Sequence, residues 1–397
     1  MIFRHLSLPP GENILLLGPR ATGKSTLLRE CFKPTATYWI DLLLPSTEDR
    51  LARDPERLLR EVEALPASFS TVVIDEIQKV PALLDVVHAL IEGPNPAGKR
   101  QFVLTGSSAR KLKSGSANLL AGRALAYSLF PFTSFELGEQ FDLSAALKYG
   151  TLPKVSQLKT EASRRKTLET YALTYINQEI RAEQAVRALD PFRKFLQVAA
   201  QSNGKIVNFS AIAKDVHVDE KTVRKYFEIL EDTLIGFFLE SFHHSVRKKV
   251  GMAPKFYFFD TGVTRALART LTLELEAGTF VWGNTFEHFV ILECQRLIAY
   301  SGNQFELNFL RTYDDKEIDL VVQRPGKPLL LVEIKSADAI QPDHVASLID
   351  LRQVIDAPAE CALFSRDPVA QVIQGIRCLP WQQGLKEYFT GPDLAVL

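Results

Sequence analysis

The chain has 397 residues, enough for two or three domains with cores of their own. Its 47 Lys and Arg balance 47 Asp and Glu, so no overall positive field attracts nucleic acid. Four widely spaced cysteines without a CxxC pair argue against a disulfide framework and a zinc site, and fit a reducing compartment. Because the start lacks a signal-peptide layout and no apolar run is long enough to span a bilayer, we expect a soluble, cytoplasmic protein with no membrane partner.

A phosphate-loop motif is the clearest feature of the sequence. Residues Gly18 to Ser25 read GPRATGKS and lie between a short apolar run, typical of a buried strand, and a predicted helix. Gly18 and Gly23 let backbone N–H groups turn toward a phosphate, and the helix adds the positive end of its dipole. Lys24 can reach the β- and γ-phosphates, and Ser25 can ligate Mg²⁺. The motif predicts a site for ATP and Mg²⁺, with Thr26 in the first helical turn.

Two acids end another predicted strand, over residues 71–76. A parallel strand directs its carboxyl end toward the ligand crevice, so Asp75 would hold Mg²⁺ and Glu76 would act as general base on the attacking water. The alternative is a helix N-terminus that carries acids for its dipole. Upstream, the sequence predicts a strand over 37–43 and one amphipathic helix over 48–65.

A third apolar strand, predicted over 101–108, ends in small hydroxyl side chains. This strand could lie between the other two and offer Thr105 or Ser107 to the γ-phosphate or the attacking water. Alternatively, the hydroxyls cap a helix predicted over 109–112.

An arginine, Arg123, stands just before a fifth predicted strand. It could reach a nucleotide across a subunit interface and stabilise transition-state charge, which would require a homo-oligomer. A surface salt bridge is the alternative. The sequence after the sheet, residues 136–190, is helix-like and predicts a helical lid over the nucleotide.

Four motifs together resemble a widespread prokaryotic family of AAA+-type ATPases. They are GPRATGKS, VVIDEIQKV, FVLTGSS, and LAGR followed by LFPFTSFEL. Members of that family join an ATPase to a C-terminal region long called a domain of unknown function. The resemblance implies a P-loop ATPase core over residues 1–135, followed by the lid.

Residues 191–262 predict three helices and a hairpin, the order of elements in a winged helix, which the family resemblance also implies. Helices are expected from 191, 208 and 218, and strands over 234–241 and 255–260. Basic side chains on the third helix and in the hairpin connection could neutralise DNA phosphates. These candidates are Lys221, Arg224, Lys225, Arg247, Lys248 and Lys249. The alternative is a set of solvated charges on a domain that binds proteins.

The C-terminal part, residues 263–397, predicts an amphipathic helix from Trp282 and four strands, the second and third of which carry acids. Alternate side chains of a strand share a face, so Glu333 and Lys335 point the same way. Asp319 precedes Glu333 by fourteen residues, enough for a hairpin that sets the two carboxylates side by side. Such a pair can hold Mg²⁺ or Mn²⁺, and a nearby lysine can orient or deprotonate water.

This D…ExK arrangement resembles the PD-(D/E)xK nuclease superfamily. The resemblance implies that Glu287 supports the metal site, that Asp319 and Glu333 bind the metal, and that Lys335 is the activating cation. Acids and lysines that alternate on a strand also mark a solvated face, which is the alternative.

The complete prediction is an α/β protein with a P-loop AAA+-type ATPase, a helical lid, a winged helix and a restriction-endonuclease-like α/β domain. Its leading function is ATP-dependent engagement of DNA, with branched or single-stranded DNA as candidates and metal-dependent cleavage as an extension. The alternative is an ATP-switched regulatory or scaffold protein whose nuclease-like domain is inert and binds proteins.

Overall fold

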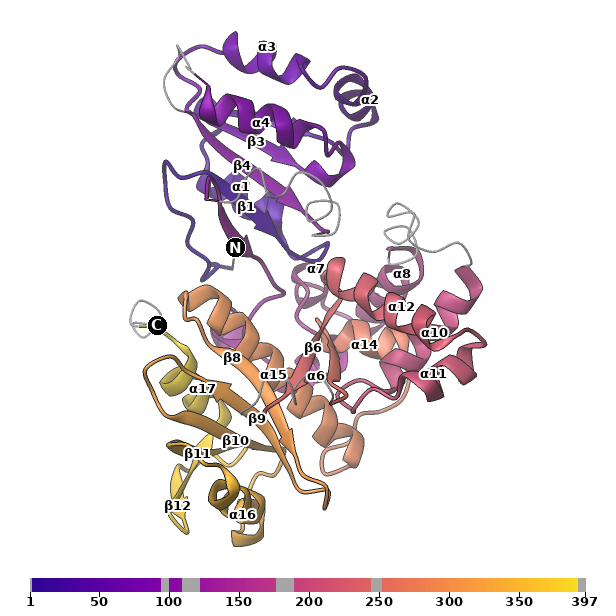
Figure 1. Cartoon of the computed structure of the whole chain (residues 1–397), viewed down its shortest axis with the longest axis vertical. Helices are drawn as coiled ribbons and strands as arrows, with labels where there is room; N and C mark the ends of the chain where they lie inside the picture. Colours follow the sequence, from indigo (N-terminus) through magenta and orange to yellow (C-terminus); the bar gives the residue numbers. More distant parts are fainter. Residues whose placement is uncertain (1, 94–99, 109–121, 176–188, 244–251, 392–397) are drawn as a thin grey trace. The chain divides into compact units, whose positions relative to one another are not determined.

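The structure is a computed structural model that describes residues 2–93, 100–108, 122–175, 189–243 and 252–391. Contacts between Cα atoms divide the chain into two compact units, which we describe separately (Figure 1). The N-terminal unit comprises Met1–Phe132 and Glu228–Ile235, and the C-terminal unit comprises Thr133–Phe227 and Gly236–Leu397.

A parallel five-stranded sheet in the order β2-β3-β4-β1-β5 forms the centre of the N-terminal unit. Its strands are β1 (Ile14–Leu17), β2 (Thr37–Asp41), β3 (Thr71–Asp75), β4 (Gln101–Gly106) and β5 (Leu125–Ser128). Strand β4 pairs with both β1 and β3, so the predicted central position of the third apolar strand is confirmed. Both β3 and β4 are fully buried, as near-continuous apolar runs predict for parallel strands.

Helices cover this sheet and supply much of its core. They are α1 (Lys24–Cys31), α2 (Pro45–Arg53), α3 (Arg57–Glu63) and α4 (Leu83–Glu92), with 3-10 turns η1 (Pro34–Ala36) and η2 (Ile77–Lys79). Helix α3 packs beside α4 (Figure 1). The single helix predicted over 48–65 is wrong, because Asp54 precedes Pro55 and adopts φ −141° and ψ 81°. A proline disfavours helical geometry in the residue before it, so the chain breaks there into α2 and α3.

The segment predicted as a lid belongs to the C-terminal unit. It contains α5 (Ser134–Leu137), η5 (Gly138–Gln140), α6 (Leu143–Tyr149), α7 (Pro153–Ser156), α8 (Glu161–Thr170) and the π-turn η6 (Tyr171–Tyr175). Ala146 and Leu147 of α6 join the same hydrophobic cluster as Phe289 and Val290. Burial of these apolar side chains packs the segment into the C-terminal core, and its role as a lid over the nucleotide stays a prediction.

Three helices, α10 (Leu189–Gln201), α11 (Phe209–Val216) and α12 (Glu220–Asp232), follow as predicted. Asn208 caps α11 by accepting a 3.0 Å hydrogen bond from the backbone N–H of Ala211, and Asp219 caps α12 through Thr222 N–H at 2.7 Å. Five aromatic rings pack between the helices, with centroids 4.8 to 5.7 Å apart. They belong to Phe192, Phe195, Phe209, Tyr226 and Phe227.

An eight-stranded sheet in the order β12-β13-β11-β10-β9-β8-β6-β7 dominates the C-terminal unit. Its strands are β6 (Gly236–Ser241), β7 (Lys255–Phe258), β8 (Glu306–Arg311), β9 (Glu317–Gln323), β10 (Leu329–Lys335), β11 (Ala359–Ser365), β12 (Gln371–Ile373) and β13 (Ile376–Pro380). The predicted β6–β7 hairpin is present, but β6 also pairs in parallel with β8 through Glu240–Asn308 and Ser241–Phe309. One sheet therefore continues across residue 262, where the sequence predicts a domain boundary.

Helices pack on both faces of this sheet. They are α14 (Thr261–Leu267), α15 (Phe280–Ser301), α16 (Ala346–Val354) and α17 (Trp381–Phe389), with the 3-10 turn η7 (Pro342–Val345). Side chains of α15 and α17 cluster with Val332 and Ile334, whereas side chains of α16 cluster with Leu331. Within the described parts of the chain, no helix is long and apolar enough to cross a membrane.

The helix predicted from Trp282 is present as α15, but it is not amphipathic, because nearly all sides of its central part are buried. Glu293 and Arg296 are 0% and 1% exposed and form a 3.1 Å ion pair. Ser134 donates to Glu293 from its backbone N–H at 2.7 Å and from its hydroxyl at 2.6 Å. Because these partners satisfy the two charges, both fit in the interior.

Candidate functional site

The phosphate loop has the backbone shape that its glycines predict. A Cβ atom at Gly18 would lie 2.2 Å from the carbonyl oxygen of Leu129, so this position accepts only glycine without rearrangement. Gly23 has a left-handed φ of 94°. The ammonium of Lys24 is buried in the loop and donates to the carbonyl oxygens of Gly18 at 2.8 Å and Pro19 at 3.2 Å. The loop therefore keeps a cation beside the space that its backbone encloses.

Helix α1 starts directly after Gly23, and this N-cap residue has no side chain with which to cap the helix. Its first turn contains no acid, and Thr26 in that turn is exposed. The uncapped N–H groups and the helix dipole favour an anion there. The phosphate loop and this helix end thus fit the phosphates of a nucleotide.

Two hydroxyl groups converge on one carboxylate at the carboxyl ends of β3 and β4. Ser25 Oγ donates to Asp75 Oδ2 at 2.6 Å, and Thr105 Oγ1 donates to Asp75 Oδ1 at 2.5 Å. Hydroxyl and carboxylate oxygens are ligands that Mg²⁺ accepts, so Ser25 and Asp75 fit the ion. Thr105 orients the carboxylate.

Glu76 occupies a strained position beside this group. Its backbone is left-handed, with φ 62° and ψ 48°, which is costly for a residue with a side chain. The Glu76 N–H donates to Thr105 Oγ1 at 3.0 Å, and the Glu76 Oε2 accepts from Ser107 Oγ at 3.1 Å. Gln78 Nε2 donates to that same Oε2 and, at 3.0 Å, to Ser107 Oγ. Sequence reasoning missed Gln78, although it lies only two residues after Glu76 in the motif VVIDEIQKV.

Arg123 lies at the amino ends of the strands, whereas the phosphate loop lies at their carboxyl ends. It precedes β5, whose first residue Leu125 pairs with Ile14 at the start of β1, and the loop follows the end of β1. Its Nε forms a 2.5 Å ion pair with Glu92 Oε1. Strand direction therefore places Arg123 at the end of the strands away from the phosphate loop, and its predicted role across an interface stays a prediction.

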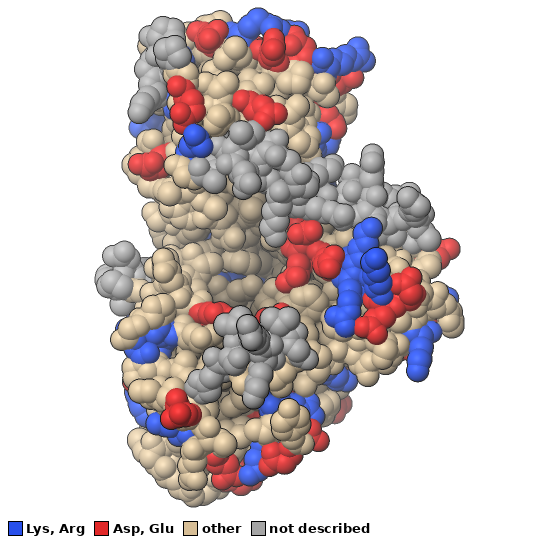
Figure 2. Space-filling view, in the orientation of Figure 1, with Lys and Arg blue, Asp and Glu red and all other residues tan. Residues whose placement is uncertain are grey.

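The basic residues predicted on α12 are all exposed, but they differ in their contacts. Arg224 forms a 2.7 Å ion pair with Glu220, and its guanidinium lies 3.9 Å from the ring centroid of Phe209. Lys221 and Lys225 lie on the same solvent-facing side of the helix. Figure 2 shows basic and acidic side chains interspersed on the face in view, as the zero net charge predicts. The predicted contacts Arg247, Lys248 and Lys249 lie outside the described residues.

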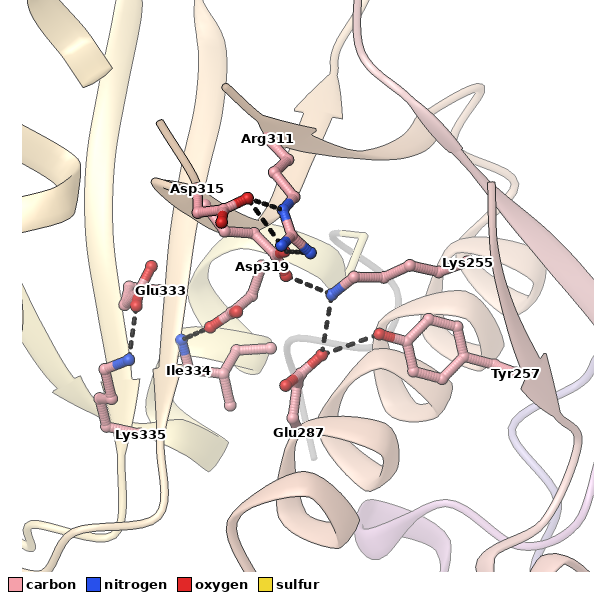
Figure 3. Close-up of polar contacts among 10 residues, drawn as sticks. Lys255, Tyr257, Glu287, Arg311, Asp315, Asp319, Glu333, Ile334 and Lys335 are labelled. Carbon is pink, nitrogen blue, oxygen red and sulfur yellow. Dashed lines mark hydrogen bonds and ion pairs between the residues drawn. The ribbon is translucent and has the colours of Figure 1, made fainter. Parts of the chain in front are cut away.

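A second polar site lies in the C-terminal unit, where strands and α15 bring charged side chains together (Figure 3). Its acids are Glu287 on α15, Glu317 and Asp319 on β9, and Glu333 on β10. We call these four residues the acid cluster. Its ammonium groups are Lys255 on β7 and Lys335 on β10.

Asp319 and Glu333 lie close together, as predicted for the β9–β10 hairpin. The strands pair up to Leu320–Val332, and Asp319 and Glu333 follow at the next position. Asp319 Oδ2 accepts from Ile334 N–H at 2.7 Å, and Glu333 Oε1 accepts from Lys335 Nζ at 2.5 Å. Burial raises the pKa of both carboxyl groups above their usual values, and the charge of Glu333 raises that of Asp319 further. The predicted solvated face is wrong, because Asp319 and Glu333 are 9% and 4% exposed.

Glu333 keeps one oxygen without a partner. Its Oε2 is buried and has no hydrogen-bond partner among the residues that the structure describes. An unsatisfied buried carboxylate oxygen is costly and is the type of atom that a divalent cation would bind. Asp319 and Glu333 therefore fit as ligands of such an ion.

Glu287 does not join them as a third ligand. Its Oε1 accepts from Tyr257 at 2.8 Å and forms a 3.5 Å ion pair with Lys255 (Figure 3). Among the residues that the structure describes, no group of three or more His, Cys, Asp and Glu could hold a metal ion. The predicted three-acid set is therefore not assembled. Because Val332 and Ile334 face α15, strand alternation turns Glu333 away from that helix and from Glu287.

Comparison with protein-family models assigns three parts of the chain. Residues 11–138 match a family described as an AAA domain, and residues 140–274 and 282–383 match domains of unknown function, DUF8612 and DUF4143. Among curated proteins, uncharacterized proteins of Mycobacterium tuberculosis (Rv2008c) and Mycobacterium bovis (Mb2031c) are each 29% identical over 366 residues, which cover 90% of this chain and 79% of theirs.

Solved structures show weaker similarity. Orc1 of Aeropyrum pernix, in complex with DNA, matches with 14% identity and a TM-score of 0.31, covering 66% of this chain and 87% of Orc1. RuvB of Thermotoga maritima matches with 19% identity and a TM-score of 0.28, covering 57% of this chain and 81% of RuvB. Scores this low do not establish a shared overall architecture. The family match and the phosphate-loop geometry together support a P-loop ATPase domain of the AAA type in residues 11–138.

Proposed function

We propose that the protein hydrolyses ATP at the carboxyl edge of the N-terminal sheet and uses it to engage DNA. The observation that carries the first part is the contact of Ser25 and Thr105 with the two oxygens of Asp75, beside Glu76. Lys24 would hold the β- and γ-phosphates, and Ser25 and Asp75 would hold Mg²⁺. Bound Mg²⁺ would neutralise charge on the phosphates.

Glu76 would take the proton of the attacking water. Its carboxylate lies at the same edge as Asp75, and Ser107 and Gln78 fix one of its oxygens. The carboxylate would orient a water and take its proton as the water oxygen bonds to the γ-phosphorus, while the bond from that phosphorus to the bridging oxygen breaks and ADP leaves. The single hydroxyl of Thr105 would fix both acids in position, because it accepts from the Glu76 N–H and donates to Asp75.

The DNA part of the proposal is supported by α11, α12 and the β6–β7 hairpin, which we infer to be a winged helix. The α11–α12 pair has the two-helix form of a DNA-binding motif, and Lys221 and Lys225 are exposed on the second helix. Arg224 supports the surface through its stacking on Phe209. The protein would act as a homo-oligomer, in which Arg123 of one copy serves the nucleotide of another.

DNA-stimulated ATP turnover tests this proposal. The rate should rise with linear, single-stranded or branched DNA and fall steeply with salt, because phosphate contacts release counterions. Replacement of Lys221 and Lys225 by Ala should weaken binding of every DNA sequence alike and reduce the salt slope by about one per lost contact. Lys194→Ala on α10, also exposed, is the matched control. ATP turnover indifferent to all three DNA forms would instead favour an ATP-switched regulatory or scaffold protein.

A second candidate function is metal-dependent DNA cleavage in the C-terminal unit, favoured by the unpartnered Oε2 of Glu333. Asp319 and Glu333 would bind Mg²⁺ or Mn²⁺, and Lys335 would orient the attacking water. In the full chain, Asp319→Asn should lower Mn²⁺ affinity and abolish any cleavage while ATP turnover persists. Lys335→Ala should spare metal binding and lose only cleavage. Identical Mn²⁺ titrations of wild type and Asp319→Asn would contradict the metal site and leave the domain inert.

A further inference from the structure

The acid cluster already contains one buried cation of its own. The side chain of Lys255 is 4% exposed, and its Nζ lies 2.5 Å from Glu317 Oε1 and 3.5 Å from Glu287 Oε1. Burial opposes the ammonium charge, but the nearby carboxylates outweigh burial and raise the pKa of Lys255. The lysine is therefore a permanent cation between two acids from different elements, β9 and α15.

The two carboxylate partners of Lys255 each contact a further side chain. Tyr257, two residues further along β7, donates to Glu287 Oε1 at 2.8 Å. Arg311 approaches the second oxygen of Glu317 at 3.6 Å. The ring of Phe309 lies 5.3 Å from the Lys255 ammonium. Two carboxylates and an aromatic ring thus surround the Lys255 ammonium, which occupies the position that a bound cation would take.

The excess negative charge of the acid cluster matches the charge of one divalent cation. With all four acids ionised, the carboxylates carry two negative charges more than the two ammonium groups, Lys255 and Lys335, balance. Arg311 adds no net charge, because it is paired at 2.9 Å with Asp315. Lys255 balances one of the charges of Glu287 and Glu317, and Lys335 balances one of the charges of Asp319 and Glu333, so each pair of acids keeps one negative charge. The unpartnered oxygen is on Glu333, and this places the divalent ion at Asp319 and Glu333.

We propose that Lys255 fills the cation position between Glu287 and Glu317 in place of a metal ion. The acid cluster then offers a divalent cation one position, at Asp319 and Glu333, and not two. The prediction that one divalent cation binds rests on the metal site proposed at Asp319 and Glu333. The role of Lys255 rests on the contacts of its own ammonium. Lys255 also comes from the hairpin beside the helices that we infer to bind DNA, and so joins that hairpin to the acids of the larger sheet.

Mn²⁺ titration of the full chain by calorimetry tests the proposal. All proteins carry Asp75→Asn, which removes the metal ligand of the nucleotide site. This background should bind one Mn²⁺, and addition of Asp319→Asn should abolish binding. Addition of Lys255→Met should raise the count to two, because Glu287 and Glu317 lose their ammonium. Further addition of Glu317→Gln should return it to one.

The outcomes separate the two proposals. A background that binds one Mn²⁺ and a Lys255→Met variant that also binds one would overturn the role of Lys255 and keep the metal site. A background that binds none and a Lys255→Met variant that gains one, lost again with Glu317→Gln, would overturn the metal site and keep the role of Lys255. Two ions in the background would overturn the role of Lys255.

Folding of the Lys255→Met variant does not limit the test. If it unfolds without metal, Mn²⁺ should restore folding, and Glu317→Gln should remove that rescue; absence of rescue would contradict the proposal. Glu317→Gln alone is an independent variant that keeps Lys255. It should bind Mn²⁺ within about twofold of the background, whereas a tenfold loss of affinity would make Glu317 a metal ligand and overturn the proposal.

Discussion

The hydroxyl of Ser25 donates a 2.6 Å hydrogen bond to Oδ2 of Asp75, across fifty positions of the sequence. The contact exists because β3 and β1 both end at the edge where the phosphate loop lies, with β4 between them. Thr105 on β4 binds the other oxygen of Asp75. The fold thus brings together two residues that fit Mg²⁺.

Lys24→Ala should abolish nucleotide binding. The ammonium is the one charged group of the phosphate loop that contacts the loop carbonyls of both Gly18 and Pro19, and its loss removes the point cation for the phosphates. Binding of a fluorescent ATP analogue measures the effect, with the exposed Lys33→Ala, just after α1, as the control. Unchanged affinity in Lys24→Ala would contradict the assigned site.

Gln78→Ala should lower kcat by roughly ten- to a hundredfold with little change in KM, because a misplaced catalytic group loses rate and not ground-state binding. Gln78 donates to both Glu76 and Ser107, so its removal leaves the Glu76 carboxylate with one hydrogen bond fewer to fix its position. Steady-state ATP turnover gives the two constants. A wild-type kcat would mean that Gln78 has only a structural role.

Arg123→Ala should bind ATP normally and hydrolyse it slowly, if the guanidinium acts across a subunit interface. Mixing this variant with Lys24→Ala should restore part of the activity, because one chain supplies the nucleotide site and the other the arginine. The measurement is ATP turnover against mixing ratio, after subunit exchange is verified. If the mixture does not regain activity, Arg123 does not act across an interface, and the ion pair with Glu92 indicates a structural role.

Stability should rise with pH between about 4 and 6.5 through His288. Burial lowers the pKa of this 2%-exposed side chain to about 4, and its Nε2–H donates to the carbonyl oxygen of Phe258 at 2.6 Å. In this range the unfolded chain binds the proton and the folded chain does not, so stability is complete above 6.5 and is lost as pH falls toward 4.

The effect should be on the order of 3 kcal/mol over the full range, from the size of the pKa difference. Urea unfolding at pH 4.5 and 7 measures it. His288→Gln, which keeps an N–H donor, should flatten the dependence, whereas the exposed His217→Asn should leave it unchanged. Equal slopes in wild type and His288→Gln would refute the assignment.

The sequence predicted the local elements well where a short stretch determines them. The phosphate loop, the strands of the N-terminal sheet, the helices α11 and α12 and the β9–β10 hairpin each depend on neighbouring residues, and all are present. The loop also predicted the close approach of backbone at Gly18, the left-handed Gly23 and the buried Lys24, because all three depend on the backbone of the loop itself.

Long-range contacts could not be predicted in the same way. The pairing of β6 with β8 joins residues almost seventy positions apart, so the hairpin appeared to belong to a separate domain. Lys255 in the sequence PKFYFFD has no local sign that Glu287 and Glu317 surround it. Burial of Glu293 and Arg296 depends on Ser134, far away in the chain, and this hid the true character of α15.

The most direct measurement of the central claim compares ATP binding and single-turnover hydrolysis in wild type and Glu76→Gln. Gln keeps the shape of the side chain but cannot accept the proton of water, and Ser25 and Asp75 remain to hold Mg²⁺. We predict equal ATP affinity and a hydrolysis rate about 10² to 10⁴ times lower, the range for loss of a general base. Hydrolysis at the wild-type rate by Glu76→Gln would contradict the assignment of this edge of the sheet as the site of catalysis.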